Sequence, residues 1–177
     1  AQEGMHGDYG ANIGKVIAIR KDLPSLLKAY AAAGSDARMN GCELPVVINS
    51  GSGNQGLTVS VPLIVYAERE HLDKEKLYRA LVISNLTAIH LKTEIGRLSA
   101  FCGAVSAGAA CGAGLAYLKD ASEEVMNHTI VNALAITSGI ICDGAKASCA
   151  AKIAVSVEAG ILGYDMYMNG QQFYGGD

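Results

Sequence analysis

An uncharged run of small residues at positions 98–118 limits the fold of this chain more than any other feature of its sequence. Ala, Gly, Ser and Cys fill most of the run. As a helix it would be roughly 30 Å long, which is also about the thickness of a membrane core. Small residues at nearly every turn favour close packing between helices. We therefore predict a buried helix in a folded core, and we do not expect a membrane partner.

The composition agrees with a core built from small side chains. Of 177 residues, half are hydrophobic, 18% are charged and 21 are glycine. A chain of this length buries roughly two-thirds of the surface that it exposes when unfolded, so it can form one domain. We predict a single helical domain over residues 1–177. Because residues 1–14 read as an interior loop and residues 170–177 carry no capping pattern, we expect this domain to be a fragment of a longer chain.

The net charge and the cysteine content limit which partners and which cellular compartment we expect for this protein. The net charge of −3 offers no basic excess to neutralise a phosphate backbone, so nucleic acid is not an expected partner. The five cysteines are an odd number and no secretory signal is visible, which favours reduced thiols over a disulfide framework. We predict a cytoplasmic protein that binds a small molecule.

Hydrophobic periodicity and capping residues predict a mainly α fold, with buried helices rich in small residues and one Gly-rich loop. Asp73 is the expected N-cap of a long amphipathic helix, and Pro62 is the expected bend of a buried one. Gly34 to Asp36 and Gly163 are expected to end helices. The helices expected besides the small-residue run cover residues 24–33, 57–68, 73–94, 125–138 and 152–162.

Three cysteines form a candidate metal site. Cys102, Cys142 and Cys149 lie 40 and 7 residues apart, each beside Gly, Ala or Ser, so the backbone can approach a bulky inorganic group. Zinc sites usually contain short C-x-x-C pairs, which are missing here, whereas irregularly spaced thiolates suit an iron–sulfur cubane. The alternative is that these cysteines are small hydrophobic core residues, which composition alone favours.

Helix geometry adds a constraint to this candidate site. Seven residues of unbroken helix would separate Cys142 and Cys149 by about 10.5 Å, too far for one small cluster. The helix must therefore break, and Asp143 and Gly144 supply turn chemistry for the break. Cys102 is expected at the start of the small-residue helix, where the helix dipole favours a thiolate. We expect the three sulfurs to converge.

The other cysteines and the histidines are weaker candidates. Cys111 is expected in the core, and Cys42 is expected to be structural, with an active-site contact as the alternative. Histidines are the local candidates for a general base, although His71 and His90 fall in or near an exposed helix. The four are His6, His71, His90 and His128.

A polar glycine loop precedes one predicted helix. Free amides, hydroxyls and a helix N-terminus together suit a carboxylate or a phosphate. An ordinary tight loop is the alternative, and a dinucleotide fingerprint fails because no strand–helix–acid unit follows. The loop also resembles the substrate loop of fold-type-II pyridoxal-phosphate enzymes, but no lysine precedes it in their Ser-x-Lys-x-x-Asn context. The candidate substrate-binding residues are Ser50, Ser52, Gly53, Asn54, Gln55 and Gly56.

Taken together, four segments of this chain resemble the iron–sulfur L-cysteine desulfidase family of the serine-dehydratase α-chain type. They cover residues 40–45, 49–56, 101–103 and 138–149. The resemblance implies a 4Fe-4S cluster on Cys102, Cys142 and Cys149, and β-elimination that converts L-cysteine to sulfide, ammonia and pyruvate. L-Serine dehydration is the alternative reaction. A pyridoxal-phosphate lyase fragment and a non-catalytic regulatory domain remain alternatives from other classes.

The same resemblance implies partners and roles. Family members are more than twice as long, and their N-terminal region contributes to the active site, so the catalytic base is unassigned and the fragment alone is expected to be inactive. We expect contact with that region and a possible homodimer. The glycine loop should hold the substrate carboxylate and face the cluster. Lys146 would either tune the cluster charge or face solvent.

Overall fold

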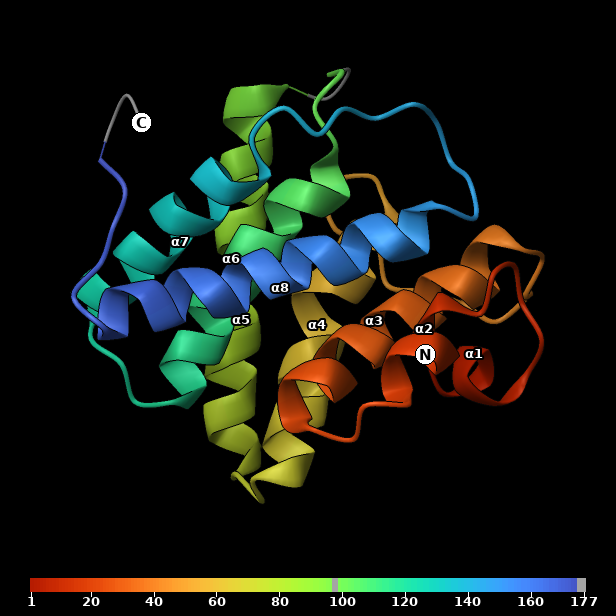
Figure 1. Cartoon of the computed structure of the whole chain (residues 1–177), viewed down its shortest axis with the longest axis horizontal. Helices are drawn as coiled ribbons and strands as arrows, with labels where there is room; N and C mark the ends of the chain where they lie inside the picture. The colour runs from red at the N-terminus through yellow and green to blue at the C-terminus, as the bar shows by residue number, and fades with distance from the viewer. Residues whose placement is uncertain (97–98, 175–177) are drawn as a thin grey trace.

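The computed structural model describes residues 1–96 and 99–174, which fold into eight helices without any strand. The mainly α prediction is therefore confirmed over the described residues. Figure 1 shows these helices arranged around one helix of small residues. They are α1 (Gln2–His6), α2 (Ile13–Ala18), α3 (Leu23–Met39), α4 (Gly53–Arg69), α5 (Lys74–Ile95), α6 (Gly103–Leu118), α7 (Glu123–Thr137) and α8 (Cys149–Met168).

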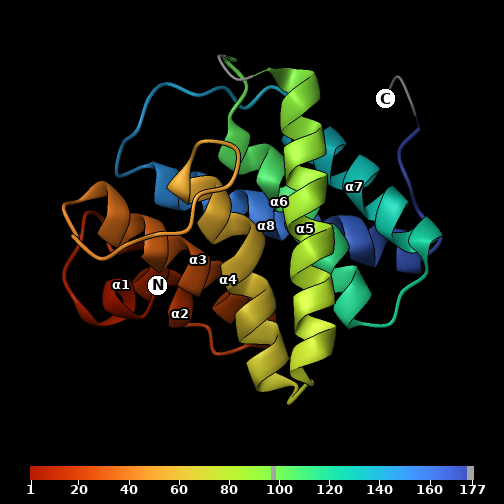
Figure 2. The same ribbon diagram turned by 180° about the vertical axis from the view of Figure 1, so that it is seen from behind.

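The central helix is α6, which the small-residue run forms. It packs against α4, α5, α7 and α8, and Gly103 and Tyr117 are its only residues that are not buried (Figures 1 and 2). The predicted buried helix is thus confirmed, although it begins at Gly103, and Leu98 lies outside the described residues. None of the helices in the described ranges is both long and apolar enough to cross a membrane.

Glycines allow α6 and α8 to approach closely. A Cβ atom on Gly108 would overlap the main chain of Ser156, and one on Gly160 would lie 2.6 Å from the Gly108 carbonyl oxygen and 3.1 Å from the Gly112 Cα. Gly108 and Gly112 on α6 therefore face Ser156 and Gly160 on α8, both pairs at a spacing of four. This small-residue contact explains why the run contains so few large side chains.

Two predicted helix ends are wrong, both at glycines. Helix α3 continues through Gly34 to Met39, because Gly34 packs against Leu57, whose Cδ2 would lie 2.8 Å from an added Cβ. Helix α8 continues past Gly163 to Met168, since Gly163 packs on α7, where Asn132 donates a hydrogen bond to its carbonyl at 3.0 Å. A glycine needed for close packing resembles a helix stop in sequence.

The N-terminal residues form short helices rather than the expected interior loop. Helices α1 and α2 cover parts of residues 1–18 and pack against α3. The buried side chain of Asp36 accepts a hydrogen bond from the Gly14 amide at 2.9 Å, and burial raises the pKa of this carboxyl group. Helices this short have no stable periodic pattern of their own, and tertiary contacts therefore decide whether they form.

The remaining helices follow the predictions more closely. Helix α5 begins at Lys74 after the predicted cap Asp73, whose carboxylate accepts a hydrogen bond from the Lys76 amide at 2.9 Å. Helix α7 begins after Ser122, which caps the Val125 amide. Helix α4 begins at Gly53, earlier than expected, and Pro62 lies inside it. As a result, the glycine loop runs directly into the first turn of α4.

Candidate active site

The main chain places two of the three candidate cysteines side by side. Phe101 and Ile141 form an isolated antiparallel bridge, and the Cys142 amide donates a hydrogen bond to the Ala100 carbonyl at 2.6 Å. The Cys102 amide donates to the Ile140 carbonyl at 3.4 Å. Cys102 is the N-cap residue of α6 and is nearly buried, whereas Cys142 is exposed.

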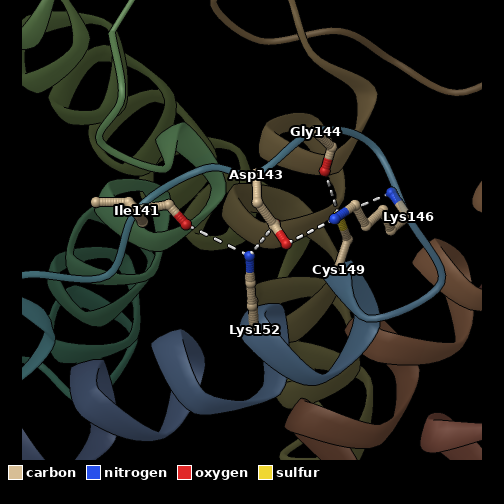
Figure 3. Close-up of polar contacts among 6 residues, drawn as sticks. All are labelled: Ile141, Asp143, Gly144, Lys146, Cys149 and Lys152. Carbon is tan, nitrogen blue, oxygen red and sulfur yellow. Dashed lines mark hydrogen bonds and ion pairs between the residues drawn. The ribbon is translucent and has the colours of Figure 1, made fainter.

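The third cysteine reaches the same region through a loop. Cys149 is the first residue of α8, and the predicted break before it is confirmed, since Gly144 has a φ of +102° and residues 138–148 are not helical. The Lys146 amide contacts the Cys149 Sγ at 3.5 Å, and this sulfur lies 3.8 Å from the Gly144 carbonyl oxygen (Figure 3).

A carboxylate between two lysines holds this loop. Asp143 forms ion pairs with Lys146 at 2.8 Å and with Lys152 at 2.6 Å (Figure 3). These lysines hold the pKa of Asp143 well below its usual range. The hydrogen bond with Asp143 raises the pKa of Lys152, and the negative charge of the Cys102 and Cys149 thiolates acts in the same direction. The Lys152 ammonium group therefore lies within electrostatic reach of both sulfurs.

These cysteines are free thiols, but they do not form a preformed site for one metal ion. In the described part of the chain, no group of three or more His, Cys, Asp or Glu side chains is placed to hold a metal ion. The expected convergence of the three sulfurs on one point is thus not seen. A cubane is bound differently, because each thiolate ligates a separate iron and the sulfurs stand around it.

The donor chemistry fits such a group. Cys102 and Cys149 lie at the N-terminal ends of α6 and α8, where the helix dipoles stabilise thiolate charge. The Lys152 ammonium adds positive charge beside the same two sulfurs. Cys142 lies in an open loop that is held by main-chain bonds rather than by the core. The residue types at these three positions are those that ligate iron–sulfur clusters, but the described part of the chain does not bring the three side chains together as a metal-binding group.

The glycine loop begins with a tight turn. Asn49 and Ser52 exchange two main-chain hydrogen bonds, of 3.0 and 3.2 Å, around Ser50 and Gly51, which both have positive φ angles, of 49° and 84°. Two such residues are typical of a type I′ turn, and Ser50 is in a region that non-glycine residues rarely occupy. The Asn49 side chain donates to the Asn85 carbonyl on α5 at 3.2 Å. The turn is therefore fixed between α4 and α5.

One side chain links the glycine loop to the cysteine region. Gln55 is 4% exposed, and its Nε2 donates to the Ser50 carbonyl at 3.4 Å. The same amide lies against Gly103, where an added Cβ would be 2.7 Å from Nε2. The Gln55 Oε1 atom is buried and has no hydrogen-bond partner among the described residues. The structure thus places Gln55, which bonds to the glycine loop, against Gly103, the residue after Cys102, and it leaves the Gln55 Oε1 acceptor unpaired.

Asn54 does not offer its side chain to this region. It is buried, its Oδ1 accepts a hydrogen bond from Arg38 at 3.2 Å, and its Nδ2 lies 3.6 Å from the Met39 sulfur. Arg38 also packs against the Cα of Gly53. These contacts fix the first turn of α4 against the end of α3, so Asn54 helps to position the loop.

An open cavity of about 750 Å³ lies beside the turn. Ser50 and Gly51 line it, together with Ile89, Lys92 and Thr93 from the C-terminal part of α5. Ser52 caps α4 without a side-chain hydrogen bond to the helix, so the first-turn amides have no such cap. Sequence reasoning missed Lys92, because a lysine in the last turn of a helix is an ordinary complement to the helix dipole.

The remaining cysteines lie elsewhere. Cys111 is fully buried in the main core cluster, where burial raises the pKa of its thiol, so the core prediction is confirmed. Cys42 follows α3 and lines a separate cavity with Ala1 and Arg38. It also contacts Tyr9, whose pKa is raised to about 12 by hydrogen bonds with Glu3 and then with Cys42.

The histidines lie away from the cavity beside the glycine loop. His6 bonds to the Gln2 carbonyl at 2.8 Å, and His71 and His90 are exposed. His128 on α7 stacks on Tyr167 of α8, with a ring-centroid distance of 4.5 Å. None of them lines that cavity in the described part of the chain, so the structure does not assign a base.

The fold and site define a helical domain with free thiols at the N-terminal ends of α6 and α8 and in the loop between α7 and α8, and with a glycine loop that runs into α4. The serine dehydratase alpha chain family matches residues 1–175, and this chain belongs to that family. The expected resemblance is thereby confirmed at the family level.

Bacterial relatives extend this comparison. The chain is 63% identical over 179 residues to a UPF0597 protein of Desulfitobacterium hafniense, 56% over 179 residues to one of Lachnoclostridium phytofermentans and 55% over 178 residues to one of Finegoldia magna. Each match covers 100% of this chain but only 42–43% of the relative, so the chain spans less than half the length of these curated relatives. No solved structure matches the chain.

Proposed function

We propose that this chain carries the cluster-binding and substrate-binding part of an iron–sulfur β-elimination lyase that acts on L-cysteine. The observation that carries the proposal is the placement of Gln55, which joins the glycine loop to the helix start at Cys102. A carboxylate-binding loop beside a thiol-rich site suits one small amino acid that is held at both ends. Membership of the serine dehydratase alpha chain family supports the same class of reaction.

Cys102, Cys142 and Cys149 would hold the cluster. When a 4Fe-4S cluster is bound there, the chemistry it supplies is Lewis acidity toward the departing β-substituent. The protein's own residues place positive potential near two of these cysteines, through the helix N-termini at Cys102 and Cys149 and the Lys152 ammonium group. Asp143 positions Lys152 and closes the loop between the last two cysteines.

The glycine loop would bind the substrate carboxylate. The first amides of α4 point their N–H groups beyond the helix end, and the Ser50 hydroxyl lies at the rim of the same cavity. Gln55 is positioned by Ser50 and Gly103, and its Oε1 is a buried acceptor without a partner among the described residues. The loop thereby orients the α-hydrogen and the β-substituent for elimination.

In the proposed reaction the α-proton leaves to a base and the Cβ–S bond breaks, releasing sulfide. The remaining aminoacrylate is hydrolysed to pyruvate and ammonia, so atoms balance with water as the only co-reactant. L-Serine would react in the same way, with water in place of sulfide as the leaving group. We propose cysteine because four segments of the sequence resemble the desulfidase family, and we propose the cytoplasm as the location because all five cysteines are free thiols.

The decisive experiment is anaerobic purification of a full-length protein that contains this chain, followed by iron and acid-labile sulfide analysis, with pyruvate measured from L-cysteine and from L-serine in parallel. We expect iron and sulfide in equal amounts and a higher kcat/KM for L-cysteine. Preference for L-serine would replace the desulfidase assignment with a dehydratase. A chromophore that borohydride reduces would instead indicate a pyridoxal-phosphate lyase, and absence of cluster, chromophore and product would indicate a non-catalytic domain.

A further inference from the structure

A buried lysine lies at the wall of the cavity beside the glycine loop. Lys92 is in the last turn of α5 and is only 8% exposed. Its ammonium group forms no hydrogen bond or ion pair with any other residue in the described ranges. Lysines with so little exposed surface rarely lack a partner. The Nζ atom is not among the fully buried polar atoms without a partner, so the ammonium group keeps some contact with solvent. A bound anion beside the Lys92 ammonium group would supply the missing partner.

Among the described residues, the surroundings of Lys92 supply no anion. The other residues that line the cavity are Ser50, Gly51, Ile89 and Thr93, and none of them carries a charge. The nearest acid in sequence, Glu94, is exposed. The adjacent α4 N-terminus adds further positive potential, since Ser52 makes no side-chain cap bond there. Two positive features thus meet at one open cavity of about 750 Å³.

The C-terminal dipole of α5 is the alternative partner for this ammonium group. A lysine in the last turn commonly complements the helix carbonyls, but it does so while it is solvated. The Lys92 carbonyl already accepts the Gly96 amide at 2.9 Å, so that end of the helix is partly satisfied. Burial of the side chain against the glycine loop is not needed for a dipole contact.

We infer that Lys92 is the counter-charge for the α-carboxylate of the amino-acid substrate, and that it selects substrates with a free carboxylate. This inference rests on the proposed function, because it assigns the substrate of the same cavity. The carboxylate would lie between the Lys92 ammonium group and the first amides of α4, with the Ser50 hydroxyl beside it. The β-substituent would then extend toward Cys102, past Gln55 and Gly103.

The test measures binding without turnover. L-Alanine has the α-carboxylate and ammonium groups but no leaving group, and L-alaninamide has the same shape without the negative charge. Calorimetric titration of the anaerobically purified, cluster-loaded protein should show L-alanine binding more tightly than L-alaninamide. In Lys92→Met the L-alanine affinity should fall about 10- to 100-fold, the loss typical for one charged hydrogen bond, with L-alaninamide affinity unchanged. Lys92→Arg should retain most of the preference.

Lys74→Met is the matched control, because Lys74 is an exposed lysine at the other end of α5. It should bind both compounds as the unmodified protein does. Equal affinity of the unmodified protein for the two compounds, or an unchanged L-alanine affinity in Lys92→Met, would overturn the inference. A variant that loses thermal stability while keeping the preference would show that Lys92 serves the helix dipole alone, which also overturns it.

A second measurement uses only the unmodified protein, so it does not depend on a variant folding. Acetylation by acetic anhydride, followed by mass spectrometry, should modify Lys92 more slowly with saturating L-alanine than with L-alaninamide, while Lys74 reacts equally in both. Equal labelling of Lys92 would contradict the inference. Iron, acid-labile sulfide and pyruvate from L-cysteine are measured on the same preparation. If these are present while Lys92 fails both tests, the inference fails and the proposed lyase stands.

Discussion

At the residue scale, the side chains around the first turn of α8 combine sulfur with paired charge. Asp143 accepts from Lys146 and Lys152, and Lys152 also donates to the Ile141 carbonyl at 3.3 Å (Figure 3). These are exposed ion pairs, so their contribution to global stability is small. Their effect is local, because they hold the segment that connects Cys142 to Cys149.

Substitution of the cysteines separates ligands from core residues. Cys102→Ser, Cys142→Ser and Cys149→Ser should each lose most of the bound iron, because a hydroxyl is a poor ligand for a cluster that thiolates bind. Iron analysis of anaerobically purified variants checks this. Cys111→Ala is the control. Cys111 is fully buried in the core, so this variant should keep its bound iron. Full iron content in any of the three serine variants would remove that residue from the ligand set.

Substitution of Asp143 tests the loop clamp, by which we mean the ion pairs of Asp143 with Lys146 and Lys152. Asp143→Asn should speed proteolytic cleavage between residues 138 and 148, because both lysines lose their charged partner, while the thermal midpoint changes little. Limited proteolysis of the cluster-free protein measures this. Glu75→Gln is the control, since it breaks an exposed Glu75–Arg79 pair within α5. Equal cleavage of unmodified protein and Asp143→Asn would contradict the clamp.

The pH dependence of the clamp follows from the Asp143 carboxyl group. Its folded pKa lies below the usual value of 3.8. A depressed acid contributes stability above its unfolded pKa and loses it as the pH falls through the folded pKa. Protection of the loop should therefore be constant from about pH 5 to 8 and disappear only in strong acid. Loss of protection within that neutral range would mean that another group holds the loop.

At the element scale, close helix contacts explain why α6 consists of small residues. Gly108 and Gly112 meet Ser156 and Gly160 on α8, and Gly114 lies against Leu63 of α4. The Ser156 hydroxyl donates to the Ala104 carbonyl at 3.3 Å, so the two helices also share a polar contact. This contact places the N-terminal ends of α6 and α8, and with them Cys102 and Cys149, at one end of the helix pair.

Alanine at Gly160 should test that contact. Helix propensity alone would favour alanine by about 1 kcal/mol, but the added methyl would press on the Gly108 carbonyl. We expect overpacking to win, with a net loss of about 1–3 kcal/mol in the free energy of unfolding. Urea denaturation followed by circular dichroism measures it. Val155→Ala is the control, because Val155 is 52% exposed on the same helix. A stabilised Gly160→Ala protein would show that the helices do not approach so closely.

At the scale of the whole molecule, most of the helical core lies apart from the cysteine segments, although Cys102 belongs to the main core cluster. The main core cluster joins apolar side chains of α3, α4, α6 and α8, among them Leu27, Leu63, Leu115 and Ile153. Cys142 lies in the loop of residues 138–148, and Cys102 and Cys149 lie at helix ends. The core therefore has its own apolar stabilisation and does not depend on a bound cluster.

Removal of the cluster should thus leave the helices folded. After exposure to air and a chelator, we expect loss of iron and of visible absorbance, with nearly unchanged far-ultraviolet circular dichroism. Proteolytic cleavage should increase in residues 138–148 only. A collapse of the helical signal would mean that the metal is part of the folding free energy, as it is in small zinc domains.

The sequence by itself determined the helical class, because periodicity and caps are local signals. Asp73 shows this, since it was predicted to cap a helix and it does cap one. The sequence also identified the candidate cysteines, the break between Cys142 and Cys149 and the glycine loop. Each of these features depends on residue type and spacing, which are local properties of the sequence.

Only the tertiary structure decided what lies next to what. Gly34 and Gly163 resemble helix stops until Leu57 and α7 are seen to need the space that a missing Cβ leaves. Asn54 reads as a substrate ligand until Arg38 is found to bind it. The role inferred for Lys92 depends on the cavity that it lines together with Ser50, which is 42 positions away in the chain. Packing and burial are non-local, so no window of the sequence contains them.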